Sequence, residues 1–247
     1  MAATNGNKIL GWLTPSLAPT LYDMAVMYQA DQIVVADTMR YSRKARVHRA
    51  RIRTKDGVQW INIPVRTEDK NKSLLHARID HSYDWQTPFI NLLHHNYSSA
   101  VYYGHLWEEL LALIERAGGY TYLLPYVSEF RSRLFRYLEV SLDSGKFLYL
   151  SELLHQKHQK ESSDPDNDAA WLNPDPDRWL QELGCGSIMQ EENSRHYIKQ
   201  SPHKMEPAFE HPVYQQQYEG FRYGCSVIDL LFQYGPESFT VLDKLKG

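Results

Sequence analysis

Two short apolar runs near the beginning of the chain predict the centre of a parallel sheet. Residues 8–13 (K-I-L-G-W-L) and 32–37 (Q-I-V-V-A-D) are rich in the apolar and β-branched side chains typical of buried strands. Residues 21–29 (L-Y-D-M-A-V-M-Y-Q), which lie between them, have a helix-like pattern. A strand, a helix and a strand in this order predict a parallel crossover, and ligands bind such sheets at the carboxyl ends of the strands. Asp37 ends the second run, so it is a candidate catalytic residue.

The next segment alternates with a period of two, which predicts a β-hairpin. In residues 47–53 (V-H-R-A-R-I-R), Arg49, Arg51 and Arg53 fall on one face of a strand and the intervening residues fall on the other. Residues 55–57 (K-D-G) predict the turn into a second alternating strand, V-Q-W-I-N-I-P-V.

Most of the remaining pattern has helical spacing. Helices are predicted at residues 85–97, 106–115, 128–142, 179–183, 226–234 and 237–244, and short strands at 75–79, 147–151 and 187–190. We therefore predict an α+β fold, in which a mixed sheet with an N-terminal βαβ crossover and a basic β-hairpin is packed by several helices. Residues 1–247 form a single domain in this prediction, with a flexible acidic loop at about 160–178, where Asp and Pro are frequent.

The apolar C-terminal helix follows a segment with many aromatic and amide side chains. Ser226 is a suitable N-cap for this helix, and Asp229 stands where a capping-box acid would. In the preceding segment His211 is a candidate catalytic acid or base, because histidine titrates near neutral pH. Tyr214, a further catalytic candidate, and Gln215, a substrate-binding candidate, would orient an acceptor. The alternative interpretation is that His211 only caps a turn.

Charge is concentrated in one short stretch. Between residues 40 and 53 there are seven Lys or Arg residues in 14 positions and no acid. Arginine binds phosphate and carboxylate groups in a bidentate manner, so Lys44, Arg49 and Arg51 are candidate substrate-binding residues for an anionic ligand. We expect Arg49 and the His211 segment to face one pocket. The alternative is a solvated edge strand whose charges prevent aggregation.

The amino-acid composition limits the classes of function that the chain can have. Hydrophobic residues make up 43% of the 247 positions, which is enough for a sizeable core, and the net charge of −3 gives no general reason to expect nucleic acid or an anionic membrane as a partner. No apolar stretch is long enough to span a membrane, and the first residues lack the pattern of a secretory signal. With only two cysteines, a reducing cytoplasm is the expected location.

The motifs of several common enzymes are missing. The chain has no G-x-G-x-x-G, P-loop or G-x-S-x-G sequence. Cys225 stands at a helix start and is a candidate nucleophile, although a small packed residue is the more usual interpretation. We predict no metal site, because adjacent histidines such as His94 and His95 point about 100° apart on a helix. The sequence identifies no cofactor.

Two stretches resemble the WbqC-like protein family. They are Q-Y-E-G-F-R-Y-G-C-S-V-I-D-L-L-F-Q-Y-G-P-E-S near the C-terminus and R-A-R-I followed by W-I-N-I-P-V nearer the N-terminus. The similarity extends from about Lys8 to Leu242. Matching positions include Arg49, Trp60, Pro64, Tyr214, Gln215, Phe221, Ser226, Asp229 and Gly235, and departures from the family pattern occur at His48, Ala50 and Gln233.

Genes of this family commonly occur among those for O-antigen and other surface polysaccharides. The resemblance therefore implies a cytoplasmic, transferase-like enzyme that modifies a nucleotide-activated sugar, with acyl or aminoacyl transfer to a sugar amine as the specific hypothesis. The expected partner is an anionic small molecule such as a nucleotide-sugar or an acyl-CoA. A non-catalytic binding or scaffold protein of the same pathway is the alternative, and single-stranded nucleic acid binding is a third hypothesis that the acidic net charge disfavours. The sequence does not indicate an oligomeric state.

Overall fold

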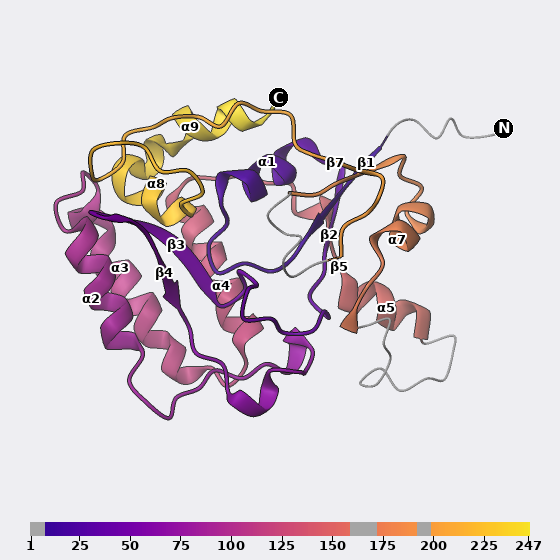
Figure 1. Ribbon diagram of the computed structural model, residues 1–247, viewed down its shortest axis with the longest axis horizontal. Helices are drawn as coiled ribbons and strands as arrows, with labels where there is room; N and C mark the ends of the chain where they lie inside the picture. Colours follow the sequence, from indigo (N-terminus) through magenta and orange to yellow (C-terminus); the bar gives the residue numbers. More distant parts are fainter. Residues whose placement is uncertain (1–7, 159–171, 192–198) are drawn as a thin grey trace.

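The fold is built on a five-stranded parallel sheet (Figure 1). The computed structural model describes residues 8–158, 172–191 and 199–247. The strands are β1 (Ile9–Leu13), β2 (Gln32–Val35), β5 (Phe147–Tyr149), β6 (Ser187–Met189) and β7 (Lys204–Met205), in the order β5-β2-β1-β6-β7. Each neighbouring pair is parallel, so the carboxyl ends of these strands lie along one edge of the sheet.

Helix α1 (Leu21–Gln29) connects β1 to β2 and confirms the predicted crossover. It begins with a complete capping box, in which the N–H of Asp23 donates to the hydroxyl of Thr20 and the N–H of Thr20 donates to the carboxylate of Asp23. Gly11 in β1 permits close packing, because a Cβ atom there would lie 3.0 Å from a side-chain atom of Val26.

A separate antiparallel hairpin consists of β3 (Arg49–Thr54) and β4 (Gly57–Asn62), with Arg51 opposite Trp60. Gly57, in the predicted turn, has a φ of 146°, a conformation that favours glycine. The α+β fold class is confirmed, with the parallel and the antiparallel pairs in two separate sheets.

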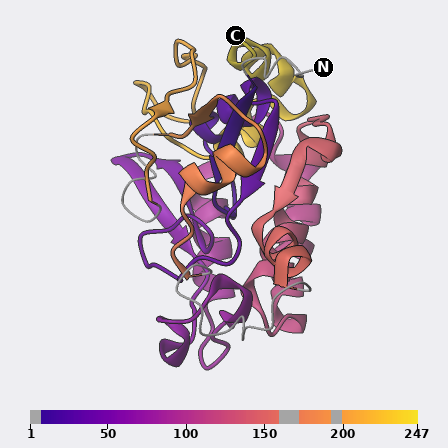
Figure 2. The ribbon, with the colours of Figure 1, turned by 90° about the vertical axis from the view of Figure 1, so that its right-hand side faces the viewer.

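Helices cover both faces of the parallel sheet. The larger core is built with α1, α2 (Gln86–Tyr97), α3 (Tyr103–Glu115), α4 (Leu123–Tyr137), α8 (Val227–Tyr234) and α9 (Phe239–Leu242), whereas α5 (Leu150–His158) and α7 (Pro176–Glu182) cover the other face. Figure 2 shows α7, in orange, in front of the indigo strands. Side chains alternate as expected in β2, where Ile33 and Val35 enter the larger core and Val34 packs in the smaller one with Trp179 of α7.

Helix α8 is enclosed on all sides, as its apolar sequence predicts. Its residues from Val227 to Gln233 are buried, and the ring of Phe232 stacks on Tyr97 at a centroid distance of 4.7 Å. The helix ends at Gly235, where φ is 49° and a Cβ atom would lie 2.5 Å from the ring of Tyr102. Short helical turns then continue to Leu245, in agreement with the predicted final helix.

Two local predictions are wrong. Residues 75–79 do not form a strand: Leu74–His76 is a 3-10 helix, and Ile79 makes an isolated bridge with Val65. The capping box at Ser226 and Asp229 does not form either, because the Ser226 hydroxyl donates to a carbonyl of the hairpin and the Asp229 carboxylate accepts from two tyrosine hydroxyls.

The predicted acidic loop at 160–178 lies largely outside the described residues. Its described end, from residue 172, leads into α7, which begins at Pro176. Asp175 caps this helix by accepting from the N–H of Asp177.

Candidate functional site

Asp37 lies at the carboxyl end of the sheet, directly after β2. Its carboxylate accepts hydrogen bonds from the N–H of Ser151 at 2.9 Å and from the Ser151 hydroxyl at 2.6 Å. Burial raises the pKa of the Asp37 carboxyl, while the Ser151 bonds act in the opposite direction. Asp37 is therefore a buried acid with a fixed orientation at the edge where parallel sheets bind ligands.

Asp37 forms part of the wall of a cavity of about 320 Å³, which we call the apolar pocket. Most of its lining is aliphatic, with Leu124 and Val127 of α4 among the contributors. Arg131, one turn further along α4, also lines the cavity, and its guanidinium lies 3.5 Å from the hydroxyl of Tyr149. The apolar pocket thus carries one acidic and one basic group on mostly apolar walls.

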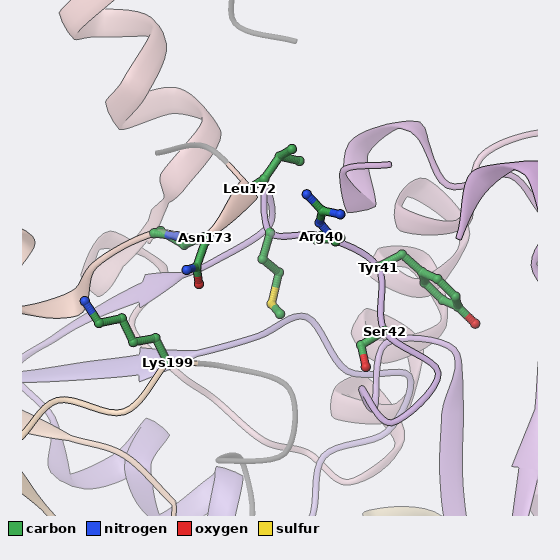
Figure 3. Close-up of a pocket in the computed structure, with 8 residues that line it drawn as sticks. Arg40, Tyr41, Ser42, Leu172, Asn173 and Lys199 are labelled. Carbon is green, nitrogen blue, oxygen red and sulfur yellow. The ribbon is translucent and has the colours of Figure 1, made fainter. Parts of the chain in front are cut away.

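A second cavity, of about 550 Å³, opens beside the segment that follows β2 (Figure 3). We call it the basic pocket, and it is lined by Met39, Arg40, Tyr41, Ser42, Leu172, Asn173, Pro174 and Lys199. In Figure 3, Arg40 and Lys199 lie on either side of Asn173. The N–H of Arg40 donates to the carbonyl of Leu172 at 3.0 Å, which holds the two walls together. Lys199 pairs with Asp175 at 3.0 Å, where both side chains are partly exposed.

A third hollow, of about 540 Å³, shares Leu172 with the basic pocket and Tyr122 with the apolar pocket. Its cations are already neutralised, because Lys72 and Arg78 both bind Asp69, at 2.8 Å and 2.7 Å. The hydrogen bond from Arg78 holds the pKa of the Asp69 carboxyl well below its usual range. Through these shared residues the three hollows form a row, and of the two cations at the basic pocket Arg40 makes no ion pair with a residue that the structure describes.

Arg46 connects this edge of the sheet to α1 through a buried ion-pair network. Its guanidinium binds both carboxylate oxygens of Asp23, at 2.9 and 3.0 Å, and both of Glu191, at 2.8 and 3.1 Å. Glu191 follows β6, so the network ties the loop after Ser42 to α1 and to the end of β6. Such fork-to-carboxylate pairs fix geometry as well as charge.

His211 lies in a cluster of aromatic rings. Its ring contacts those of Tyr22, Phe209, Phe221 and Tyr223, with centroid distances between 5.0 and 6.1 Å. Nδ1 lies 3.1 Å from the carbonyl oxygen of Pro212, which can only accept, so Nδ1 carries the proton and Nε2 has a free lone pair. Burial lowers the pKa of His211, which keeps the imidazole neutral at pH 7. The imidazole of His211 can therefore accept a proton at Nε2. The hydrogen bond between Nδ1 and the Pro212 carbonyl is equally compatible with the alternative that His211 only caps a turn.

The structure joins the hairpin to the C-terminal segment through Arg51 more directly than through Arg49. The guanidinium of Arg49 donates to the carbonyls of Lys44 and Ala45 and stacks on Trp60 at 4.0 Å. A Cβ atom at Gly224 would lie only 2.8 Å from Nη1 of Arg51. The guanidinium of Arg51 therefore packs against the backbone of Gly224, which follows Tyr223 of the His211 cluster. Lys44 is exposed on the loop before β3.

The other C-terminal candidates have different environments. Tyr214 is buried, and its hydroxyl donates to Asp229 at 2.9 Å, whereas the side chain of Gln215 is exposed. Burial raises the pKa of Asp229 to about 6 and that of the Cys225 thiol to about 12. Cys225 is a free, buried thiol, so the structure favours the packed-residue interpretation over the nucleophile hypothesis.

Sequence reasoning missed Lys199, Asn173 and Arg131. Lys199 and Asn173 reach the basic pocket from segments more than 130 positions away from Arg40, and no local pattern marks them. Arg131 stands on an amphipathic helix where a solvated arginine is the ordinary expectation. Arg40 belongs to the basic run that the sequence marks, and it follows β2 and Asp37 by only a few residues.

Two general properties complete the description. Within the described ranges, no group of three or more His, Cys, Asp or Glu side chains is arranged to hold a metal ion. Over the same part of the chain, no helix combines the length and the apolar character needed to cross a bilayer.

Comparison with known proteins identifies the family. The chain is 28% identical over 80 residues to "Uncharacterized protein Rv1507c" of Mycobacterium tuberculosis, which corresponds to 32% of this chain and 35% of that protein. The chain thus matches about a third of that relative's length. No solved structure matches. The model of the WbqC-like protein family matches residues 15–241, which include the hairpin, the row of hollows and the His211 cluster. The chain therefore belongs to the WbqC-like protein family.

Proposed function

We propose that the protein is a transferase that modifies a nucleotide-activated sugar in the synthesis of surface polysaccharides such as O-antigen. Membership of the WbqC-like family supports the pathway, because genes of this family commonly occur among those for surface polysaccharides. The observation that carries the proposal is the basic pocket, which lies at the carboxyl edge of a parallel sheet and presents Arg40 and Lys199.

The basic pocket has the size and charge that suit a nucleoside diphosphate. Its volume of about 550 Å³ falls within the range of roughly 300–1,000 Å³ found for small-molecule sites. Arg40 is exposed and makes no ion pair with any other residue that the structure describes. An arginine fork can bind two phosphoryl oxygens, and Asn173 and Ser42 offer hydrogen bonds to a ribose or sugar hydroxyl. Lys199, which also lines the pocket, would have to share its charge between the ligand and Asp175.

His211 is the proposed proton acceptor. In acyl transfer from an acyl-CoA, the amine of the sugar attacks the thioester carbonyl, a C–N bond forms, the C–S bond breaks, and the CoA thiolate leaves. Nε2 of His211 takes the proton that the amine loses and returns it to the thiolate. Burial and, to a smaller extent, the charge of Glu191 raise the pKa of Tyr22 in this cluster, and Glu191 is also bound by Arg46 of the loop after Ser42.

The remaining candidates have supporting parts in this proposal. Lys44, Arg49 and Arg51 would supply further positive charge for an anionic ligand, with Arg49 and Arg51 both lying over the ring of Trp60. Tyr214 would have an indirect, positioning role, because its hydroxyl already donates to Asp229. The side chain of Gln215 is exposed and can contact an acceptor.

Calorimetry with nucleotide ligands tests the proposal. We expect UDP- or dTDP-sugars, or an acyl-CoA, to bind the wild type, and Arg40→Ala to weaken that binding at least tenfold. Arg43→Ala is the matched control, because Arg43 is exposed three residues away and does not line the basic pocket. If no member of the ligand panel binds, or if the two variants bind equally, the basic pocket is not the nucleotide site.

Complementation separates an enzyme from a binding protein. In a strain that lacks the gene, His211→Gln should restore little polysaccharide if His211 moves a proton. Full restoration by His211→Gln together with failure of Arg40→Ala would support the alternative of a non-catalytic binding protein.

A further inference from the structure

The apolar pocket places two opposite charges in one small cavity. Asp37 lies at the end of β2, and Arg131 enters from α4 beside Tyr149, the last residue of β5. The register of the sheet sets this arrangement, because Val35 is paired with Tyr149 and the chains continue side by side to the hydrogen bonds between Asp37 and Ser151.

Both charged groups remain able to bind a ligand. Each oxygen of the Asp37 carboxylate accepts one hydrogen bond from Ser151 and has a second lone pair. Across the residues that the structure describes, neither Asp37 nor Arg131 makes an ion pair, and the contact of Arg131 is a 3.5 Å approach to the Tyr149 hydroxyl. Charges on apolar walls without a partner are costly, so a ligand that pairs both of them gains more than one that pairs either alone.

We propose that the apolar pocket binds a free α-amino acid with an apolar side chain. The ammonium group would lie against Asp37, the carboxylate against Arg131 and the Tyr149 hydroxyl, and the side chain against Leu124 and Val127. The volume of about 320 Å³ is at the small end of the range for ligand sites, which suits an amino acid better than a nucleotide. This inference does not depend on the proposed nucleotide site, because the two cavities have different linings.

Thermal shift with the panel of twenty amino acids at millimolar concentration, followed by calorimetry, tests this inference without any nucleotide. We expect leucine, isoleucine or valine to stabilise the wild type. The single-charge analogues 4-methylpentanoate and isoamylamine should bind at least tenfold more weakly than leucine, because each leaves one charge unpaired.

Variants locate the site. Asp37→Asn and Arg131→Gln should each weaken amino-acid binding at least tenfold, whereas Arg133→Gln, on the same helix but outside the lining, should bind as the wild type does. Equal unfolding midpoints without ligand would show that the variants are folded. If a variant does not fold, a crystal of the wild type soaked with leucine shows directly where the ligand binds. The inference is overturned if no apolar amino acid binds, if either analogue binds as tightly as leucine, or if the Arg133 control loses binding equally.

Discussion

Replacing Tyr97 with phenylalanine should destabilise the protein more than the loss of an ordinary buried hydroxyl. The Tyr97 hydroxyl donates to the carboxylate of Asp229 at 2.9 Å and accepts from the N–H of Arg53 at 2.9 Å, and all three groups are almost completely buried. A hydrogen bond to a charged group contributes about 1.5–3 kcal/mol, and a buried N–H left without an acceptor costs about 1–3 kcal/mol. Because these terms are not additive, we expect Tyr97→Phe to lower the free energy of unfolding by about 2–4 kcal/mol at pH 8.

The loss should depend on pH through Asp229. Burial raises the pKa of this carboxyl from 3.8 to about 6, so the folded protein holds the proton more tightly than the unfolded chain does. The stability that comes from this proton is fully present below about pH 4 and is lost as the pH rises through 6, an effect on the order of 3 kcal/mol. Above pH 6 the ionised carboxylate relies on its hydroxyl donors, so Tyr97→Phe should cost at least about 1 kcal/mol more at pH 8 than at pH 5.

Urea unfolding at both pH values, followed by tryptophan fluorescence and circular dichroism, measures these differences. Tyr126→Phe is the matched control, since Tyr126 is equally buried but donates to a neutral acceptor, the carbonyl of Leu113, at 3.3 Å. The control should lose about 1 kcal/mol at both pH values. Equal losses for the two variants at pH 8, or a loss for Tyr97→Phe that does not grow between pH 5 and pH 8, would refute the reasoning.

Two further pairs of substitutions test the packing around the candidate site. Arg46→Met leaves two buried carboxylates without their common partner, and we expect a loss of about 3–5 kcal/mol in urea unfolding, against less than about 0.5 kcal/mol for the exposed Arg43→Met. Gly224→Ala and Gly220→Ala place a side chain at φ values of 74° and 73°, which costs about 1–2 kcal/mol in each case. Gly224→Ala also meets Nη1 of Arg51 at 2.8 Å, whereas nothing lies within 4 Å at Gly220. Because this nitrogen is the far end of a flexible side chain that can move aside, thermal unfolding should show similar losses for the two variants, and a clearly larger loss for Gly224→Ala would show that the guanidinium is held in place.

The elements that could be predicted are those whose cause is local. The crossover from β1 to β2 and the alternation of β3 follow from patterns within a few residues, because the periods of helices and strands are properties of short segments. Local sequence could not show that the predicted capping box between Ser226 and Asp229 would fail to form. Asp229 has the right spacing for a capping box, but Tyr97, 132 positions earlier, offers a better hydrogen bond.

The candidate site shows the same division. The carboxyl-edge rule located Asp37 from the sequence, because a crossover determines which end of a strand faces ligands. Tertiary packing brings Lys199 to the basic pocket and Arg131 to the apolar pocket, and no periodic pattern in the sequence marks either residue. The arginine face of the hairpin was expected as a unit, but the fold turns Arg49 toward its own loop and encloses Arg53 under residues 218–220.

The enclosure of Arg53 has a consequence for synthesis on the ribosome. Its guanidinium donates to the carbonyls of Glu219 and Gly220, so the hairpin near the beginning of the chain acquires its cover from residues about 166 positions later. At about 5–20 residues per second, those partners are translated roughly 10–30 s after the hairpin. Until then the Arg53 guanidinium has acceptors only in its own hairpin, at Thr54 and Gly57, and lacks its cover, and such long-range closure is slow in folding. Ribosome-bound chains that end before Glu219 should therefore be cleaved readily by trypsin at Arg53, and chains released at full length should resist.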